Sequence, residues 1–307
     1  MTKRNVAYCY FLLYLLAIVM LFGCIASFGW TRTWAVLIPT YLSPSFTDMR
    51  VIQGAVTSAN QGLNPQISNP NDPWNRPLNY PLIWVKIGQG LNLPDESRFI
   101  QFCSLEIMCF LLICAYILFR FPSLGLLACL LSGATLACIE RGNIDLIIYS
   151  LVFVFALVSP RMLSPIPVLV ATALKLYPVF LLGILLIKRQ FILFITSLIF
   201  SLAIFGYMWD ELAIIRTSTP SSRWYSYGFP SLALHFSALN LPSWMIAGVI
   251  VLICSAISII ALYFRRIEGH LQADGFKFSL FLAGASIYIG TFIFSSNWDN
   301  RLIFLIL

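Results

Sequence analysis

Charged residues are scarce in this sequence. Only 10% of its 307 residues are Asp, Glu, Lys or Arg, whereas a soluble domain usually carries about 25%. Hydrophobic residues make up 60%, and long apolar runs recur from Val6 almost to Leu307. This composition excludes an ordinary soluble domain and indicates an integral membrane protein that crosses the bilayer many times. We expect a single helical membrane domain over residues 1–307.

Several sequence motifs of well-known metal, nucleotide and hydrolase sites are also missing. The eight cysteines include no C-x-x-C pair and lie within or beside apolar segments, which argues against a disulfide framework or a zinc site. There is no phosphate-binding glycine loop and no nucleophile elbow, which argues against an ATP-driven pump and the known hydrolase types. The net charge is +7, but no basic stripe exists, so we expect membrane lipids and no nucleic acid as partners of these cations.

The apolar runs predict an all-α polytopic membrane protein with about nine to ten helical segments. The runs cover residues 6–28, 99–119, 124–139, 144–158, 166–174, 179–187, 191–208, 244–264, 278–294 and 302–307. The first run is too long for a signal-peptide core and no A-x-A site follows it, so we expect an uncleaved helix. The last run is still apolar at Leu307, so we expect the complete protein to continue further.

Two stretches interrupt the apolar pattern, at residues 29–98 and 209–241. The first is rich in Pro, Asn, Gly and Trp and contains an amphipathic piece at 49–59. Both are dense in aromatic residues, which is not typical of flexible linkers. We expect structured caps on the membrane domain, the first of them a long outer loop.

The basic residues of the short loops predict the orientation of the chain. With Lys3 and Arg4 in the cytoplasm, both long stretches lie on the outer side of the plasma (inner) membrane. The rule is satisfied further along if 175–178 is a turning point between two short buried segments. Pro178 favours such a break, because proline does not continue a helix. The polar residues of the chain then gather on the non-cytoplasmic side.

Asp48, soon after the first apolar run, is our candidate catalytic residue. A buried carboxylate there would suit a general base that deprotonates an acceptor hydroxyl. The alternative is a helix N-cap, for which Thr47 or Asp48 would serve. Further along the same loop, Asn79-Tyr80-Pro81 predicts a rigid aromatic turn.

The segment Glu140-Arg141-Gly142-Asn143-Ile144-Asp145 lies between two apolar runs. Gly142 permits a tight turn, and Asn143 would cap the next helix, with Asp145 favoured by its dipole. Capping does not explain Glu140 and Arg141, which are costly at a membrane boundary unless they are paired or functional.

Lys175 interrupts an apolar stretch, where an ionisable residue costs roughly 2.5–3.5 kcal/mol on insertion scales. It would hold a lipid-linked phosphate as a point charge, or else snorkel to the interface. Glu106 lies inside an apolar run in the same way, and the simplest reading there is a pair with a cation.

The segment Asn297-Trp298-Asp299-Asn300-Arg301 precedes the final run. Asp299 and Arg301 would form an interfacial salt bridge, or would bind sugar hydroxyls and phosphate. His235, after the second long stretch, is either a structural residue or an aid to proton transfer.

In this order, the motifs resemble those of glycosyltransferase family 87, integral membrane enzymes of the GT-C fold that include polyprenyl-phosphate-mannose-dependent mannosyltransferases. The motifs are an acid in the first outer loop, Gly62-Leu63-Asn64-Pro65, Asn79-Tyr80-Pro81, Glu140-Arg141-Gly142-Asn143, Leu174-Lys175-Leu176-Tyr177-Pro178 and Asn297-Trp298-Asp299-Asn300-Arg301. The resemblance implies chemistry on the outer face with a lipid-linked sugar donor. It assigns the role of general base to Asp48.

The expected reaction moves a hexose or pentose, with mannose favoured, from a polyprenyl-phosphate donor to a hydroxyl of a lipid or glycan acceptor, with inversion. Position and charge make Lys175, Arg141 and Arg301 the candidates for holding the donor phosphate. No acid pair accompanies Asp48, so we expect no metal and no other cofactor. The expected substrate-binding residues are Tyr80, Glu140, Asn143, Tyr177, Arg223, Trp224, Tyr225, His235, Asn297 and Asp299.

Two other classes of function compete with this one. A transporter or flippase of a lipid-linked or small polar substrate would place its polar site near the bilayer midplane and would often carry internal repeats. We find no clear repeat, and the polar groups cluster on one side. The other competitor is a structural subunit of an envelope complex, whose outer loops would serve as contacts.

Overall fold

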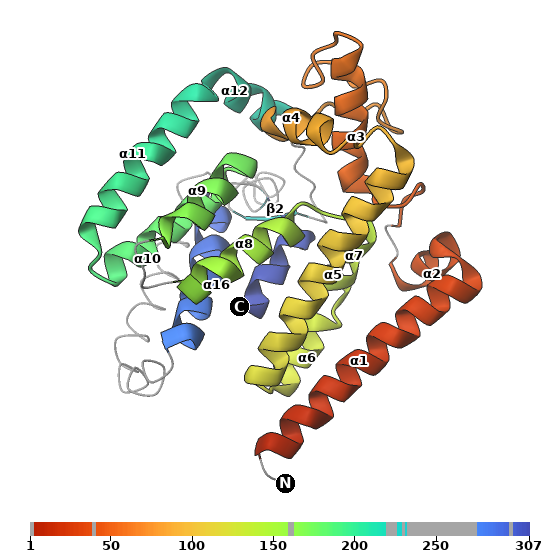
Figure 1. Ribbon diagram of the computed structural model, residues 1–307, viewed down its shortest axis with the longest axis vertical. Helices are drawn as coiled ribbons and strands as arrows, with labels where there is room; N and C mark the ends of the chain where they lie inside the picture. Colours follow the sequence, from red (N-terminus) through yellow and green to blue (C-terminus); the bar gives the residue numbers. More distant parts are fainter. Residues whose placement is uncertain are drawn as a thin grey trace, which may run out of the picture.

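A computed structural model describes residues 3–38, 41–158, 163–218, 226–228, 231, 275–294 and 297–307. Its elements are α1 (Lys3–Phe28), α2 (Trp30–Leu37), α3 (Thr47–Asn60), α4 (Ile83–Gly90), α5 (Glu96–Arg120), α6 (Leu124–Leu130), α7 (Gly133–Arg141), α8 (Asp145–Val158), α9 (Pro165–Leu174), η1 (Tyr177–Leu181), α10 (Leu182–Ile187), α11 (Phe191–Tyr207), α12 (Trp209–Ser218), β1 (Ser226–Tyr227), α16 (Gly275–Phe294), β2 (Asn297–Trp298) and η3 (Asp299–Ile306). The protein is mainly helical (Figure 1).

Four helical segments of the described chain are long and apolar enough to cross a membrane. They are Asn5–Phe28, Glu96–Arg120, Leu124–Arg141 and Gly275–Ile293. A fifth crossing results if α11 and α12, which are bent by 74° relative to each other, are counted as one span. The prediction of a mainly helical protein with several apolar helices that could span a membrane is therefore confirmed. The apolar run 244–264 lies outside the described residues.

The helix α5 shows how the sequence divides between core and lipid. Its buried residues recur every three or four positions, from Phe99 through Cys103 and Ile107 to Phe110 and Cys114, which gives one inward face. The helix α1 packs along α5, with the rings of Tyr8 and Phe11 edge-on to that of Phe119. Most of the remaining surface of α1 is apolar and exposed, as expected for a helix that faces lipid.

The break predicted near Pro178 is present. The helix α9 ends at Leu174, Lys175 is extended (φ −159°, ψ 116°), and a 3₁₀ turn, η1, begins at Tyr177. The helices α8 and α9 pack together, and α16 packs on α8, η1 and α10. Lys175 therefore lies between two helical segments, where its side chain can contact neighbouring elements.

The first long stretch is structured, as expected. The amphipathic piece predicted at 49–59 is the helix α3, and the loop after it returns to α4. This loop lies so close to α3 that a Cβ on Gly54 would be 2.5 Å from the backbone nitrogen of Asp72. Figure 1 shows α3, α4 and α12 together at one end of the molecule, opposite the N-terminus of α1.

The predicted N-cap of α3 is wrong. The cap position is Phe46, in the left-handed region at φ 61°, and no side chain caps the helix. The hydroxyl of Thr47 instead lies 3.4 Å from the carbonyl oxygens of Leu42 and Pro44. Asp48 is thus in the first turn of α3 without serving as its cap.

Candidate functional site

The start of α3 and the end of α7 are pressed together, and this contact sets the position of Asp48. Gly142 closes α7 at φ 53°, and a Cβ there would lie 3.2 Å from the Cβ of Phe46. Glu140 lies two residues before this contact on one side, and Asp48 lies two residues after it on the other. The glycine is required both for its positive φ and for this close approach.

Asn143 links Asp48 to the next helix. Its side-chain amide donates a hydrogen bond to Oδ2 of Asp48, and its Oδ1 accepts a hydrogen bond of 2.9 Å from the backbone nitrogen of Asp145. The second of these bonds is the predicted cap of α8, which is confirmed. The same side chain therefore fixes the carboxylate of Asp48 and the N-terminus of α8.

Asp145 is the centre of a buried polar cluster. Its Oδ1 accepts hydrogen bonds from Nζ of Lys175 and from the hydroxyl of Tyr177, each at 2.6 Å. The guanidinium carbon of Arg301 lies 4.6 Å from the ring centroid of Tyr177, and Arg301 also interacts electrostatically with Asp145. Burial lowers the pKa of the Lys175 ammonium below its ordinary value, although the negative charge of Asp145 opposes this shift.

Tyr80 covers the cluster from the loop between α3 and α4. Nζ of Lys175 lies 5.3 Å from the ring centroid of Tyr80. Burial, and then the charges of Asp48 and Asp145, raise the pKa of the Tyr80 phenol well above its ordinary value. Four residues further on, the indole nitrogen of Trp84 donates a 2.9 Å hydrogen bond to the carbonyl of Leu174, which fixes the loop to the residue before Lys175.

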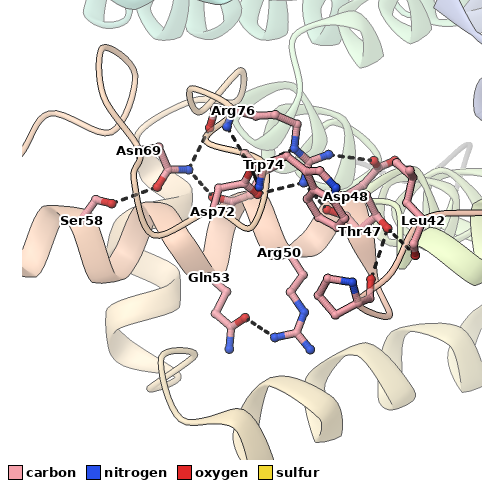
Figure 2. A network of polar contacts seen from close by, with 12 residues as sticks. Leu42, Thr47, Asp48, Arg50, Gln53, Ser58, Asn69, Asp72, Trp74 and Arg76 are labelled. Carbon is pink, nitrogen blue, oxygen red and sulfur yellow. Dashed lines mark hydrogen bonds and ion pairs between the residues drawn. The ribbon is translucent and has the colours of Figure 1, made fainter. Parts of the chain in front are cut away.

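Arg76 reaches Asp48 from the loop after α3 (Figure 2). Its guanidinium is held in a fork by Asp72, with Nε 3.0 Å from Oδ2 and Nη2 2.9 Å from Oδ1. Nη2 also donates to the carbonyl of Thr47 at 2.6 Å, and Nη1 lies 3.9 Å from Oδ1 of Asp48. Because Asp72 largely neutralises Arg76, the ion pair with Asp48 is weak.

The carboxyl groups near Asp48 differ in their access to solvent. The side chain of Asp48 is 17% exposed, whereas those of Glu140 and Asp145 are 0% and 2% exposed. Glu106, on the inward face of α5, is also buried, and neither of its carboxyl oxygens accepts a hydrogen bond within the described part of the chain. Asp48 is therefore the acid of this cluster that a bound molecule reaches most easily.

Arg141 and Glu140 lie at the margin of the cluster. Nε of Arg141 is 3.8 Å from Oε2 of Glu140, and Glu140 also interacts electrostatically with Asp48. Glu106 interacts electrostatically with Asp145, Lys175 and Asp48. Glu106 therefore interacts electrostatically with a cation, Lys175, but forms no hydrogen bond with it.

The remaining expected residues are placed in part. Arg223, Trp224, Tyr225 and His235 lie outside the described residues. For Asn297 and Asp299 the backbone is described: Asn297 pairs with Tyr227 in the antiparallel β1–β2 ladder, and Asp299 begins η3. The ladder joins the second long stretch to the segment that carries Arg301.

Three residues of the cluster could not be recognised as site residues from the sequence. Asp145 was expected only at a helix start, yet it is also the partner of Lys175. Arg76 and Trp84 gave no local pattern, because their contacts with Asp48 and Leu174 span long sequence separations. Among the described residues, no three His, Cys, Asp or Glu side chains are grouped so as to hold a metal ion.

No family model, no curated protein and no solved structure matches the chain. The cluster combines the accessible carboxylate of Asp48 with Lys175 and Arg301, two cations that neighbour the buried carboxylate of Asp145. Such a set of groups is suited to proton abstraction beside a bound anion.

Proposed function

We propose that this protein is a membrane glycosyltransferase of the GT-C type, similar to glycosyltransferase family 87. In this proposal it transfers a hexose or pentose, with mannose favoured, from a polyprenyl phosphate to a hydroxyl of a lipid or glycan acceptor. The reaction takes place on the non-cytoplasmic side of the plasma membrane. One observation carries the proposal: Asn143 and Asp145 connect the accessible carboxylate of Asp48 to Lys175 in a continuous hydrogen-bonded path.

The charges of the cluster support an anionic ligand. Lys175 and Arg301 both neighbour Asp145, so two cations share one buried carboxylate at this point. A phosphate placed beside Lys175 and Arg301 would balance the second positive charge. Arg141 is a further cation of the cluster, and its partner Glu140 interacts electrostatically with Asp48.

The steps of the reaction follow from this arrangement. Asp48 accepts the proton of the acceptor hydroxyl while the oxygen of that hydroxyl attacks the anomeric carbon of the donor sugar. The bond between that carbon and the phosphate oxygen breaks, and polyprenyl phosphate leaves with the electron pair. Lys175 and Arg301 offset the charge that develops on the leaving phosphate. Water later removes the proton from Asp48, and a single displacement inverts the anomeric centre.

Substitution of Asp48 by asparagine tests the proposal. The asparagine carbonyl still accepts the hydrogen bond from Asn143, so the contact between the start of α3 and the end of α7 is expected to remain intact. Turnover should fall by about 10²–10⁴-fold, the usual contribution of a general base. The assay incubates purified protein with a panel of polyprenyl-phosphate sugars and measures released polyprenyl phosphate. Asp210→Asn, at an exposed acid in the first turn of α12, is the matched control.

The outcomes separate the competing functions. Turnover by Asp48→Asn equal to that of the unchanged protein would show that Asp48 is not the base. If no donor of the panel is cleaved while the reconstituted protein moves a lipid-linked sugar across a vesicle membrane, the transporter or flippase function is correct. A structural subunit would show neither activity.

A further inference from the structure

The loop after α3 places an arginine beside the proposed general base (Figure 2). Nη1 of Arg76 lies 3.9 Å from Oδ1 of Asp48. A cation at this distance stabilises the charged form of a carboxylate and makes it a weaker base, typically by about one to three pH units. The contact is therefore unfavourable for proton abstraction by Asp48 unless another group offsets the charge of Arg76.

The side chain of Asp72 supplies this offset. It is 0% exposed and binds Arg76 through both oxygens, with Oδ1 2.9 Å from Nη2 and Oδ2 3.0 Å from Nε. Oδ2 also accepts hydrogen bonds from the backbone nitrogens of Trp74, at 3.1 Å, and of Arg76, at 2.9 Å. The carboxylate of Asp72 thus lies closer to the guanidinium than that of Asp48 does, and it is the principal counterion of Arg76.

Further contacts fix the position of the guanidinium. Its Nη2 donates a 2.6 Å hydrogen bond to the carbonyl of Thr47, and its carbon lies 4.5 Å from the ring centroid of Trp74. The backbone carbonyl of Arg76 accepts a 3.0 Å hydrogen bond from the side-chain amide of Asn69, which also donates to the carbonyl of Val51 in α3. The loop is therefore tied to α3, and the 3.9 Å between the guanidinium and the proposed base exceeds the length of a hydrogen bond.

Asp48 also interacts electrostatically with titratable groups of other elements. These are Tyr80 of the loop between α3 and α4, Glu106 of α5, Cys138 and Glu140 of α7, and Lys175 between α9 and η1. Arg50, two residues after Asp48 in α3, is directed to Glu96 of α5, at 2.6 Å. The influence of Arg76 depends on the adjacent carboxylate of Asp72, so an isosteric substitution of Asp72 changes it while the other groups stay in place.

We propose that Asp72 is a positioning residue, which keeps Asp48 an effective base by holding Arg76 and offsetting its charge. The inference rests on the proposed function, because it takes Asp48 as the group that removes the acceptor proton. It adds a second acid on which the rate depends. Asp72 is fully buried and acts through Arg76 without contacting a substrate.

The test compares Asp72→Asn with the double variant Asp72→Asn/Arg76→Gln. The asparagine carbonyl still accepts the backbone hydrogen bonds of the turn, but it leaves Arg76 without its main counterion, whereas the double variant removes both charges. Protonation of Asp48 is followed by infrared spectroscopy, and each titration is repeated with Asp48→Asn to identify the carboxyl band of Asp48. The pH dependence of polyprenyl phosphate release is measured in parallel.

The expected shifts have a definite sign. In Asp72→Asn, the titration midpoint of the Asp48 band and the acidic limb of the pH–rate profile should move to lower pH by about one unit or more, and turnover above that limb should fall about three- to tenfold. In the double variant, both should return to within about half a unit of the unchanged protein, because neither charge is left. Arg98→Gln, at an exposed arginine of α5, is the control and should shift neither.

Two results would overturn the inference. One is a midpoint that Asp72→Asn leaves in place, which would make the role of Asp72 structural even if turnover fell. The other is a double variant whose midpoint lies about one unit or more from that of the unchanged protein, and this result decides the point even if Asp72→Asn alone does not fold. The infrared titration needs no substrate, so failure of every sugar donor to react would contradict the glycosyl transfer alone.

Discussion

The buried pair of Lys175 and Asp145 gives the sharpest test of how this cluster is held together. Its Nζ–Oδ1 distance is 2.6 Å, and the side chains are 12% and 2% exposed. Lys175→Met removes the cation with little change of volume, and Asp145→Asn removes the anion while the hydrogen bond from Tyr177 is retained. Measuring both single variants and the double variant isolates the interaction between the two groups.

The expected magnitudes follow from burial. Removal of one partner of a buried ion pair costs about 3–5 kcal/mol, because the other charge remains without compensation. In Lys175→Met, Asp145 keeps Tyr177, Arg301 and the N-terminus of α8, so we expect about 3 kcal/mol, at the lower end. Asp145→Asn leaves Lys175 near two aromatic rings and should cost about the same. The double variant leaves neither charge, so it should lose far less than the roughly 6 kcal/mol sum, with a coupling energy of about 3 kcal/mol.

The assay is equilibrium unfolding in mixed micelles of a mild detergent and dodecyl sulfate, followed by tryptophan fluorescence. A coupling energy within about 0.5 kcal/mol of zero would refute the reasoning, because the two side chains would then contribute independently. In that case the double variant would lose the full sum of the two single losses, about 6 kcal/mol relative to the unchanged protein. That result would mean that the charges of this cluster are compensated in another way.

Two further changes probe how the segment after α3 is positioned. Gly54→Ala places a methyl group 2.5 Å from the backbone of Asp72 and should destabilise the protein by about 1–3 kcal/mol in thermal unfolding, whereas Gly23→Ala, with no atom within 4 Å, should be neutral or stabilising by up to about 1 kcal/mol. Equal effects of the two changes would contradict the close packing of the loop on α3. Trp84→Phe leaves the Leu174 carbonyl without its donor and should cost about 1–3 kcal/mol, which chemical unfolding measures against Trp209→Phe on the exposed side of α12.

Most of the helical architecture could be predicted from the sequence, because apolar periodicity reports on each segment alone. The helix α3 was recognisable from its amphipathic pattern, the end of α7 from Gly142, and the break after α9 from Lys175 and Pro178. These features depend on backbone preferences within a few residues. Gly142 is an example. Its positive φ of 53° favours glycine for a local reason, whereas its contact with Phe46 involves a distant part of the chain.

The failed prediction at the start of α3 has a tertiary cause. Thr47 and Asp48 have the chemistry of N-caps, yet neither side chain caps the helix. The close contact between Phe46 and Gly142 accompanies a left-handed backbone at Phe46, and the side chain of Asp48 accepts a hydrogen bond from Asn143, in the connection between α7 and α8. A rule based on local sequence does not include a competing partner 95 residues away.

The organisation of the site depends on pairings that sequence spacing does not encode. Asp145 has two roles at once, because its backbone nitrogen receives the cap from Asn143 and its carboxylate binds Lys175. Capping alone accounts for an aspartate at this position, so the residue gave no reason to look for a second role. The second role becomes visible from Lys175, since a buried ammonium in an apolar protein requires an anion close by. The partners of the most costly buried charge therefore identify Asp145, which its position at a helix start does not.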